Sequence, residues 1–128
     1  LTNAKEEAYM LTSYKSVASI RMMRPEPVVE MHPKMVRKLK LKEGDWVTIE
    51  TDKGKIRQRL SLNKNIDPRV VMAAFGWWFP EEPGPDHGVW RSNANVLTRN
   101  GPPYDPAMGT YHLRGLLCRI APVRPGDA

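Results

Sequence analysis

This sequence has one cysteine and no long apolar run. Cys118 is its single cysteine, so neither an internal disulfide nor a multi-cysteine metal site can form. No apolar run approaches the ~20 residues of a membrane-spanning helix, and the mean hydropathy is −0.53, so we expect no membrane insertion. Burial of apolar side chains must therefore hold the fold. Cys118 follows two leucines and is itself predicted to be a buried strand residue.

Sequence motifs of autonomous catalysis are also missing. Neither GxGxxG nor GxxxxGK[ST] occurs, and no GxSxG phrase frames a serine. The three histidines, His32, His87 and His112, show no metal-binding spacing, which argues against a structural zinc site. If the chain binds phosphates, it must use backbone donors of loops together with basic and hydroxyl side chains.

The clearest structural signal that is present is a hairpin at residues 44–62. Val47, Ile49 and Thr51 alternate with Trp46, Thr48 and Glu50, which predicts a strand with one buried face. The return strand repeats the alternation, with Ile56, Gln58, Leu60 and Leu62 on its apolar side. Gly54 is expected to end the turn in a left-handed conformation. Gln58 on the apolar face predicts a buried hydrogen-bonded partner or a position near the strand's edge.

Around this hairpin, short extended segments and one helix are expected. The strands are predicted at residues 9–11, 19–23, 28–31, 69–75 and 115–123, and the helix begins after His32 and Pro33. Residues 1–7 and 124–128 read as polar tails, which leaves residues 8–123 as one domain. Residues 79–110 hold six prolines and should contain little regular structure. Trp77 and Trp78 are expected in core and rim packing. The sequence therefore predicts a mainly β fold, a small closed barrel with one or two short helices and a long Pro/Gly-rich loop.

A net charge of +6 indicates anionic partners. The basic residues gather around the predicted helix, at Lys34, Arg37, Lys38, Lys40 and Lys42. One interpretation is a solvated helix face, and the other is a nucleic-acid surface. Aromatic residues are not interleaved with these charges, so a stacking platform for single strands is not indicated.

The order of several short phrases resembles the C-terminal molybdopterin dinucleotide-binding domain of the dimethyl-sulfoxide-reductase family. The resemblance covers residues 9–123. The matching phrases, in chain order, are Thr12 to Lys15 where the family has Thr-Gly-Arg, His32-Pro33, Gly44-Asp45, Gly76-Trp77, Asn95 to Thr98, and Asp105-Pro106 with Gly109 and Arg114. The first phrase departs from the family, since Ser13 replaces its glycine.

This resemblance implies a fold and a set of cofactor-binding residues. The fold is a double-psi β-barrel. The implied cofactor contacts are Thr12, Ser13, Tyr14, Lys15, His32, Asn95, Thr98, Asp105 and Arg114. An amide or carboxylate at Asn95 or Asp105 could read a guanine edge, and hydroxyls and a charge at residues 12–15 could hold a pyrophosphate. His32 could equally cap the helix that follows it.

The resemblance also implies a parent enzyme. It would be a molybdenum or tungsten oxidoreductase that carries bis(molybdopterin guanine dinucleotide), with hydratase-like members in the same group. The chain by itself would be non-catalytic, with the metal ligand and any iron–sulfur cluster in upstream catalytic domains, and electron-transfer subunits as further partners. Any targeting signal would lie upstream, which leaves cytoplasm and periplasm open. The rival hypothesis is a basic β-barrel that binds nucleic acid or a protein.

Overall fold

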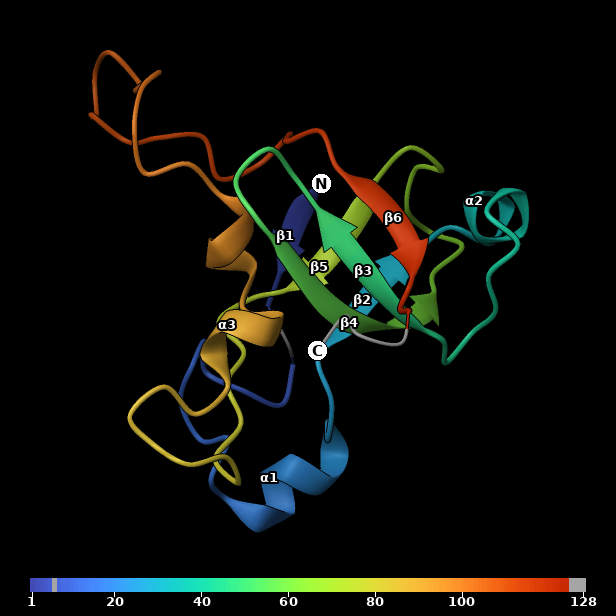
Figure 1. Ribbon diagram of the computed structural model, residues 1–128, viewed down its shortest axis with the longest axis vertical. Helices are drawn as coiled ribbons and strands as arrows, with labels where there is room; N and C mark the ends of the chain where they lie inside the picture. Colours follow the sequence, from blue (N-terminus) through green and yellow to red (C-terminus); the bar gives the residue numbers. More distant parts are fainter. Residues whose placement is uncertain (6, 125–128) are drawn as a thin grey trace.

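The computed structural model describes residues 1–5 and 7–124 and shows a six-stranded sheet with short helices around it (Figure 1). The strands are β1 (Thr2–Ala4), β2 (Val28–Met31), β3 (Trp46–Glu50), β4 (Lys55–Leu62), β5 (Val71–Ala74) and β6 (Arg119–Pro122). The helices are α1 (Ala18–Met23), α2 (Pro33–Lys38), α3 (Val89–Ser92) and the 3₁₀ turn η1 (Ala94–Leu97). The mainly β prediction is thus confirmed.

The sheet is mixed, in the order β1-β5-β2-β4-β3-β6. β1 runs parallel to β5 and β2 parallel to β4, while the other neighbours are antiparallel. Beyond the two edge strands, the backbone N–H groups of Gly115 and Leu116 donate to the carbonyl of Leu1 over 2.9 and 3.2 Å. The strand order therefore begins and ends at segments that bond to each other. Such closure is consistent with the predicted double-psi barrel.

The core lies inside this curled sheet. In Figure 1 the strands β6, β3 and β4 lie in front of β1, β5 and β2. Their inward side chains form one apolar cluster, which includes Val29, Met31, Val47, Ile49, Ile56, Leu60, Val71 and Ala73. The predicted alternation of the hairpin is confirmed, because Val47, Ile49, Ile56 and Leu60 are all buried.

Gln58 occupies the apolar face of β4 and is fully buried. Of the two outcomes predicted for it, a hydrogen-bonded partner or a position near the strand's edge, the structure shows the first. Its side-chain Nε2 donates to the carbonyls of Ala74 and Ser92 over 3.1 and 2.9 Å, and its Oε1 accepts from the N–H of Ala74 over 2.9 Å. One amide thereby joins β4, the end of β5 and the end of α3. The same contact ties the sheet to the irregular segment that follows residue 79.

The N-terminal third differs most from the sequence prediction. Residues 1–7 were expected to be a tail, yet Thr2–Ala4 form β1. This strand exists through its pairing with β5, and the sequence of residues 1–7 has no alternation that predicts it. Residues 9–11 form turns instead of a strand, since Tyr9 is buried and its hydroxyl donates to the carbonyl of Arg24 over 2.6 Å. Residues 18–23 are helical, because Ala, Arg and Met favour helix over strand. The predicted tail at 124–128 lies outside the described residues except for Arg124.

The hairpin turn also differs, because Gly54 does not have a positive φ. The reason for a glycine there is close packing. A Cβ at residue 54 would lie 2.7 Å from the carbonyl oxygen of Val96 and 2.8 Å from its Cγ1. The absence of a side chain thus lets η1 rest directly on the hairpin tip.

The remaining predictions concern single residues. Trp77 is fully buried and Trp78 half-buried at the rim, as expected. Cys118 is half-buried and precedes β6 by one residue, and burial raises the pKa of its thiol. Along the described ranges, no helix has both the length and the apolar character that crossing a bilayer requires.

An ion pair beside α2 gives a testable electrostatic property. Hydrogen bonds from the Arg69 side chain and N–H hold the pKa of Asp67 at about 2. We expect Arg69→Ala to return this pKa toward 3.8, measured by NMR titration of the carboxyl. Because the folded pKa is lowered, the pair stabilises the protein above pH 3.8 and the benefit disappears as pH falls through about 2. Lys64→Ala, an exposed change nearby, should leave the titration unmoved.

Candidate functional site

Three loop segments meet at the edge of the barrel around α3. They are residues 12–15, which follow β1, residues 75–79, which follow β5, and residues 92–98. The indole Nε1 of Trp78 donates to the carbonyl of Thr12 over 2.7 Å. Gly76 has a φ of +61°, and a Cβ there would lie 2.7 Å from Cγ2 of Thr12, so glycine is required at this crossing.

The segment at residues 92–98 is held rigidly against the sheet. The Ser92 hydroxyl donates to the carbonyl of Arg57 over 2.8 Å, beside the Gln58 contact described above. Asn93 is buried, and its side-chain oxygen accepts from the N–H of Asn95 over 3.0 Å, which caps η1. The Thr98 hydroxyl donates to the carbonyl of Asn95 over 3.0 Å. These contacts leave the amide of Asn95 exposed at the tip of a fixed turn.

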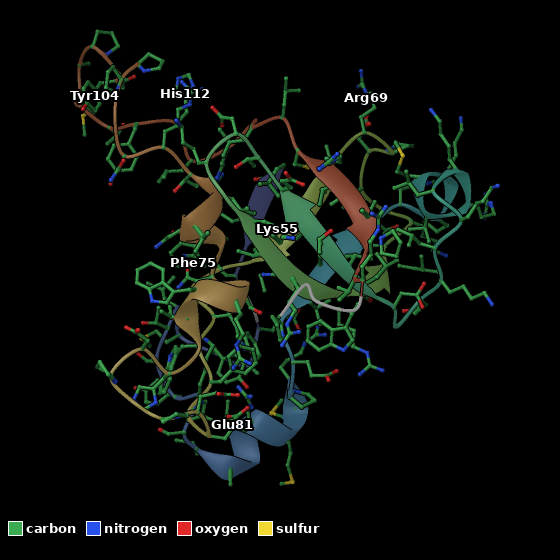
Figure 2. The ribbon with its side chains drawn as sticks, viewed as in Figure 1. Lys55, Arg69, Phe75, Glu81, Tyr104 and His112 are labelled. Carbon is green, nitrogen blue, oxygen red and sulfur yellow. The ribbon has the colours of Figure 1, made fainter. Side chains whose placement is uncertain are left out.

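Two hollows flank this segment. One, of about 410 Å³, is bounded by Thr12, Trp78, Pro85, Asp86, His87, Val89 and Asn93. The other, of about 730 Å³, is bounded by Lys53, Phe75, Asn95, Val96, Thr98, Asn100, Gly109, Thr110, Tyr111 and Leu113. Figure 2 shows Phe75 next to α3 at the sheet edge. Three of the predicted site residues therefore line the two hollows beside the segment at residues 92–98: Thr12 lines the smaller one, and Asn95 and Thr98 line the larger one.

Within the first phrase, the four predicted residues have different environments. Thr12, Ser13 and Tyr14 are exposed, and Tyr14 has a positive φ of 69°. Lys15 is fully buried. Its Nζ donates to the carbonyl of Leu11 over 3.1 Å and lies 4.3 Å from the centre of the Tyr9 ring and 5.0 Å from that of Trp77. In this structure the exposed hydroxyls, and not the Lys15 ammonium, are available to a ligand.

The other predicted residues do not join the three segments. His32 caps α2, where its Nδ1 accepts from the N–H of Lys34 over 3.0 Å, and α2 lies across the sheet from α3 in Figure 1. Capping was one of the two roles left open for His32. Asp105 is exposed and holds its own loop, accepting from the N–H groups of Ala107 and Met108 over 3.0 and 2.7 Å.

Asp105 and Arg114 belong to a protruding arm, residues 99–114. Figure 2 shows Tyr104 and His112 on this arm, away from the sheet. Tyr104 and Tyr111 form a bridge that closes the outer part of the arm, and Arg114 is exposed near its base. Gly109 to Tyr111 and Leu113 line the larger hollow, so the arm forms one of its walls although Asp105 and Arg114 do not line it.

Sequence reasoning missed several residues of the site. Among the described residues that line the larger hollow, Lys53 is the one cation, and its Nζ lies 3.9 Å from a carboxylate oxygen of Asp52. His87 and Trp78 line the smaller hollow with their rings 5.6 Å apart. Lys53 lies in the hairpin turn, next to Gly54, and no sequence spacing links a turn residue to a segment about forty residues later. Among the residues that the structure describes, no cluster of His, Cys, Asp and Glu could hold a metal ion.

The model of the family described as "Molydopterin dinucleotide binding domain" matches residues 1–116. Among curated proteins, the chain is similar to dopamine dehydroxylase of Eggerthella lenta, with 32% identity over 127 residues, or 99% of this chain and 12% of that protein. It is also similar to acetylene hydratase of Syntrophotalea acetylenica, with 29% identity over 116 residues, or 87% of this chain and 16% of that protein.

A solved structure with the same fold is acetylene hydratase from Pelobacter acetylenicus. The TM-score is 0.88 at 24% sequence identity, over 96% of this chain and 18% of that one. The chain thus spans less than a fifth of the length of these relatives. None of the three is described as a protein that binds nucleic acid, so the rival hypothesis gains no support.

Proposed function

The chain belongs to the molydopterin dinucleotide binding domain family of molybdenum and tungsten oxidoreductases, and we propose that its guanine-facing contacts are made by the segment at residues 92–98. The cofactor class is a molybdopterin dinucleotide. The guanine form is part of the proposal, as are the parent's reaction, its upstream domains, any iron–sulfur cluster and any electron-transfer subunit.

One observation carries the proposal: a rigid turn presents the Asn95 amide between two hollows. A guanine edge offers both hydrogen-bond donors and an acceptor, and a side-chain amide can accept from the donors and donate to the acceptor. The turn is fixed by the Asn93 cap and by contact with Gly54, so little motion must be lost when a ligand binds.

The residues around the larger hollow fit a dinucleotide in chemistry as well as in size. Its volume of about 730 Å³ lies within the usual range for ligand pockets. The Thr98 and Thr110 hydroxyls and the Lys53 ammonium line it, and these groups suit a pyrophosphate. When bound, the cofactor supplies the metal chemistry of the parent enzyme. The residues of this chain orient it and exclude water.

The test is Asn95→Ala in the complete enzyme. We expect a clear loss of guanine nucleotide and metal per purified protein, because a buried polar contact is worth roughly 1–3 kcal/mol, or about five- to 150-fold in cofactor affinity. The side chain is exposed in this chain, so the melting temperature of the cofactor-free protein should not change.

Asn65→Ala is the matched control, since Asn65 is an exposed asparagine outside the two hollows. Normal nucleotide content in the Asn95 variant would remove this residue from the site. A nucleotide other than guanine in the purified enzyme would overturn the guanine assignment and leave the pocket in place.

A further inference from the structure

The segment at residues 10–23 presents an unusual surface. Six of its large apolar side chains are exposed, and two of them, Met22 and Met23, are 77% and 70% exposed. The full set, which we name the α1 face, is Met10, Leu11, Tyr14, Val17, Met22 and Met23. Exposed apolar groups in isolation are ordinary, but six within fourteen residues mark a surface that another body covers.

Exposed charge is scarce in the same stretch, because its two charged side chains, Lys15 and Arg21, turn inward. Charged residues make up 27% of the chain, yet from Ala8 to Ile20 the only one is Lys15, which is fully buried beneath Tyr9 and Trp77. Arg21 turns inward as well, bonded to Glu81 over 2.8 Å and stacked 5.0 Å above the Trp77 ring. Depletion of charge at the centre of an apolar patch is typical of interfaces.

Within the described chain, α1 is anchored through Arg21 and Ile20 and not through the side chains of the α1 face. α1 has six residues, none of them buried, and a helix of this length is not stable by itself. Leu11 and Tyr14 have positive φ values of 56° and 69°, which cost energy for residues other than glycine. Beneath the face, Nη1 of Arg21 and Nε1 of Trp77 are buried without a hydrogen-bond partner in the described structure.

We propose that the α1 face packs against another part of the same, longer polypeptide. The chain spans only 12 to 18% of its relatives, so a large body is available in a single chain. Thr12 lies between Leu11 and Tyr14 and also lines the smaller hollow. The covering part would therefore contact both the α1 face and the edge of the site. The inference rests on the proposed longer polypeptide and is independent of which nucleotide is bound.

Methionine oxidation in the complete protein tests this directly. With dilute hydrogen peroxide and peptide mass spectrometry, we expect Met10, Met22 and Met23 to oxidise at least about tenfold more slowly in the native protein than after unfolding. The protection should persist when the protein is diluted and when other subunits are removed. Full-rate oxidation of Met22 and Met23 in the native protein would overturn the proposal.

Protection that disappears on dilution would assign the face to a second copy, and protection that disappears with another subunit would assign it to that subunit. Either result contradicts the proposal. A Met22→Lys and Met23→Lys double variant should also restore oxidation at Met10, whereas Leu62→Lys, an exposed apolar residue elsewhere, should not. The Asn95 test reports nucleotide content, so failure of one inference is distinguishable from failure of the other.

Discussion

Gln58→Leu should destabilise the protein by about 3–5 kcal/mol, the largest effect that we expect from a single substitution. The change keeps the side chain's approximate volume but removes the partners of three buried backbone groups, the N–H and carbonyl of Ala74 and the carbonyl of Ser92. Each orphaned buried group costs roughly 1–3 kcal/mol. Denaturant unfolding followed by tryptophan fluorescence measures the loss.

The matched control is Asn65→Leu, an amide-to-leucine change at an exposed position, which should stay within about 0.5 kcal/mol of the wild type. Because Gln58 also holds the end of α3, amide exchange at residues 92–98 should accelerate more than exchange in β3. Unchanged stability of Gln58→Leu would mean that the three hydrogen bonds do not form in solution.

Ile49→Ala should cost about 2–4 kcal/mol through the loss of buried surface and the cavity that remains. Ile49 is fully buried in β3, which pairs with β4 on one side and β6 on the other, so its neighbours cannot easily collapse into the space. Val47 is also fully buried, and a smaller loss is expected for Val47→Ala because fewer atoms are removed.

Leu117→Ala provides the comparison for this experiment, since Leu117 is 94% exposed and should contribute almost nothing. Thermal unfolding of the three variants gives the ranking. A melting temperature for Ile49→Ala equal to that of Leu117→Ala would show that the inner face of the hairpin has been misassigned.

The hairpin and the partner of Gln58 could be predicted because their signals are local. Alternation in β3 and β4 identifies the buried face, and a glutamine on that face must find hydrogen bonds. His32-Pro33 likewise marked the start of α2 by capping chemistry. In each case residues within a few positions of one another determine the outcome.

The N-terminal region could not be predicted in this way. β1 is three residues long, two of them polar, and it exists through its pairing with β5. Residues 19–23 were expected to be extended, yet they belong to the helix Ala18–Met23, which is anchored by the stacking of Arg21 on Trp77. Gly54 was correctly placed in a turn, but its purpose depends on Val96, forty residues away.

The family phrases bring together only part of the candidate site, again because the remaining contacts are between residues far apart in the sequence. The family phrase at Asn95 to Thr98 coincides with a rigid turn, and Thr12 lies near it. Lys15 is buried because it packs against Tyr9 and Trp77. Both aromatic residues lie outside the phrase at residues 12–15, so that phrase alone does not predict the burial. Lys53 and His87 are identified as lining residues only by the three-dimensional arrangement of the loops.

Each edge strand pairs with a strand that is distant in the sequence, and this affects the order in which the molecule folds. β1 bonds to β5 across roughly 70 residues, and β3 bonds to β6 across a similar distance, whereas β3 and β4 are joined by a short turn. Contacts between distant residues form slowly because the intervening loop must first be closed. On a ribosome, the first strand must therefore wait for residue 72 to emerge, and the hairpin forms before either edge is in place. The last contacts to form are those of Gly115 and Leu116 with the carbonyl of Leu1, which close the strand order into a ring.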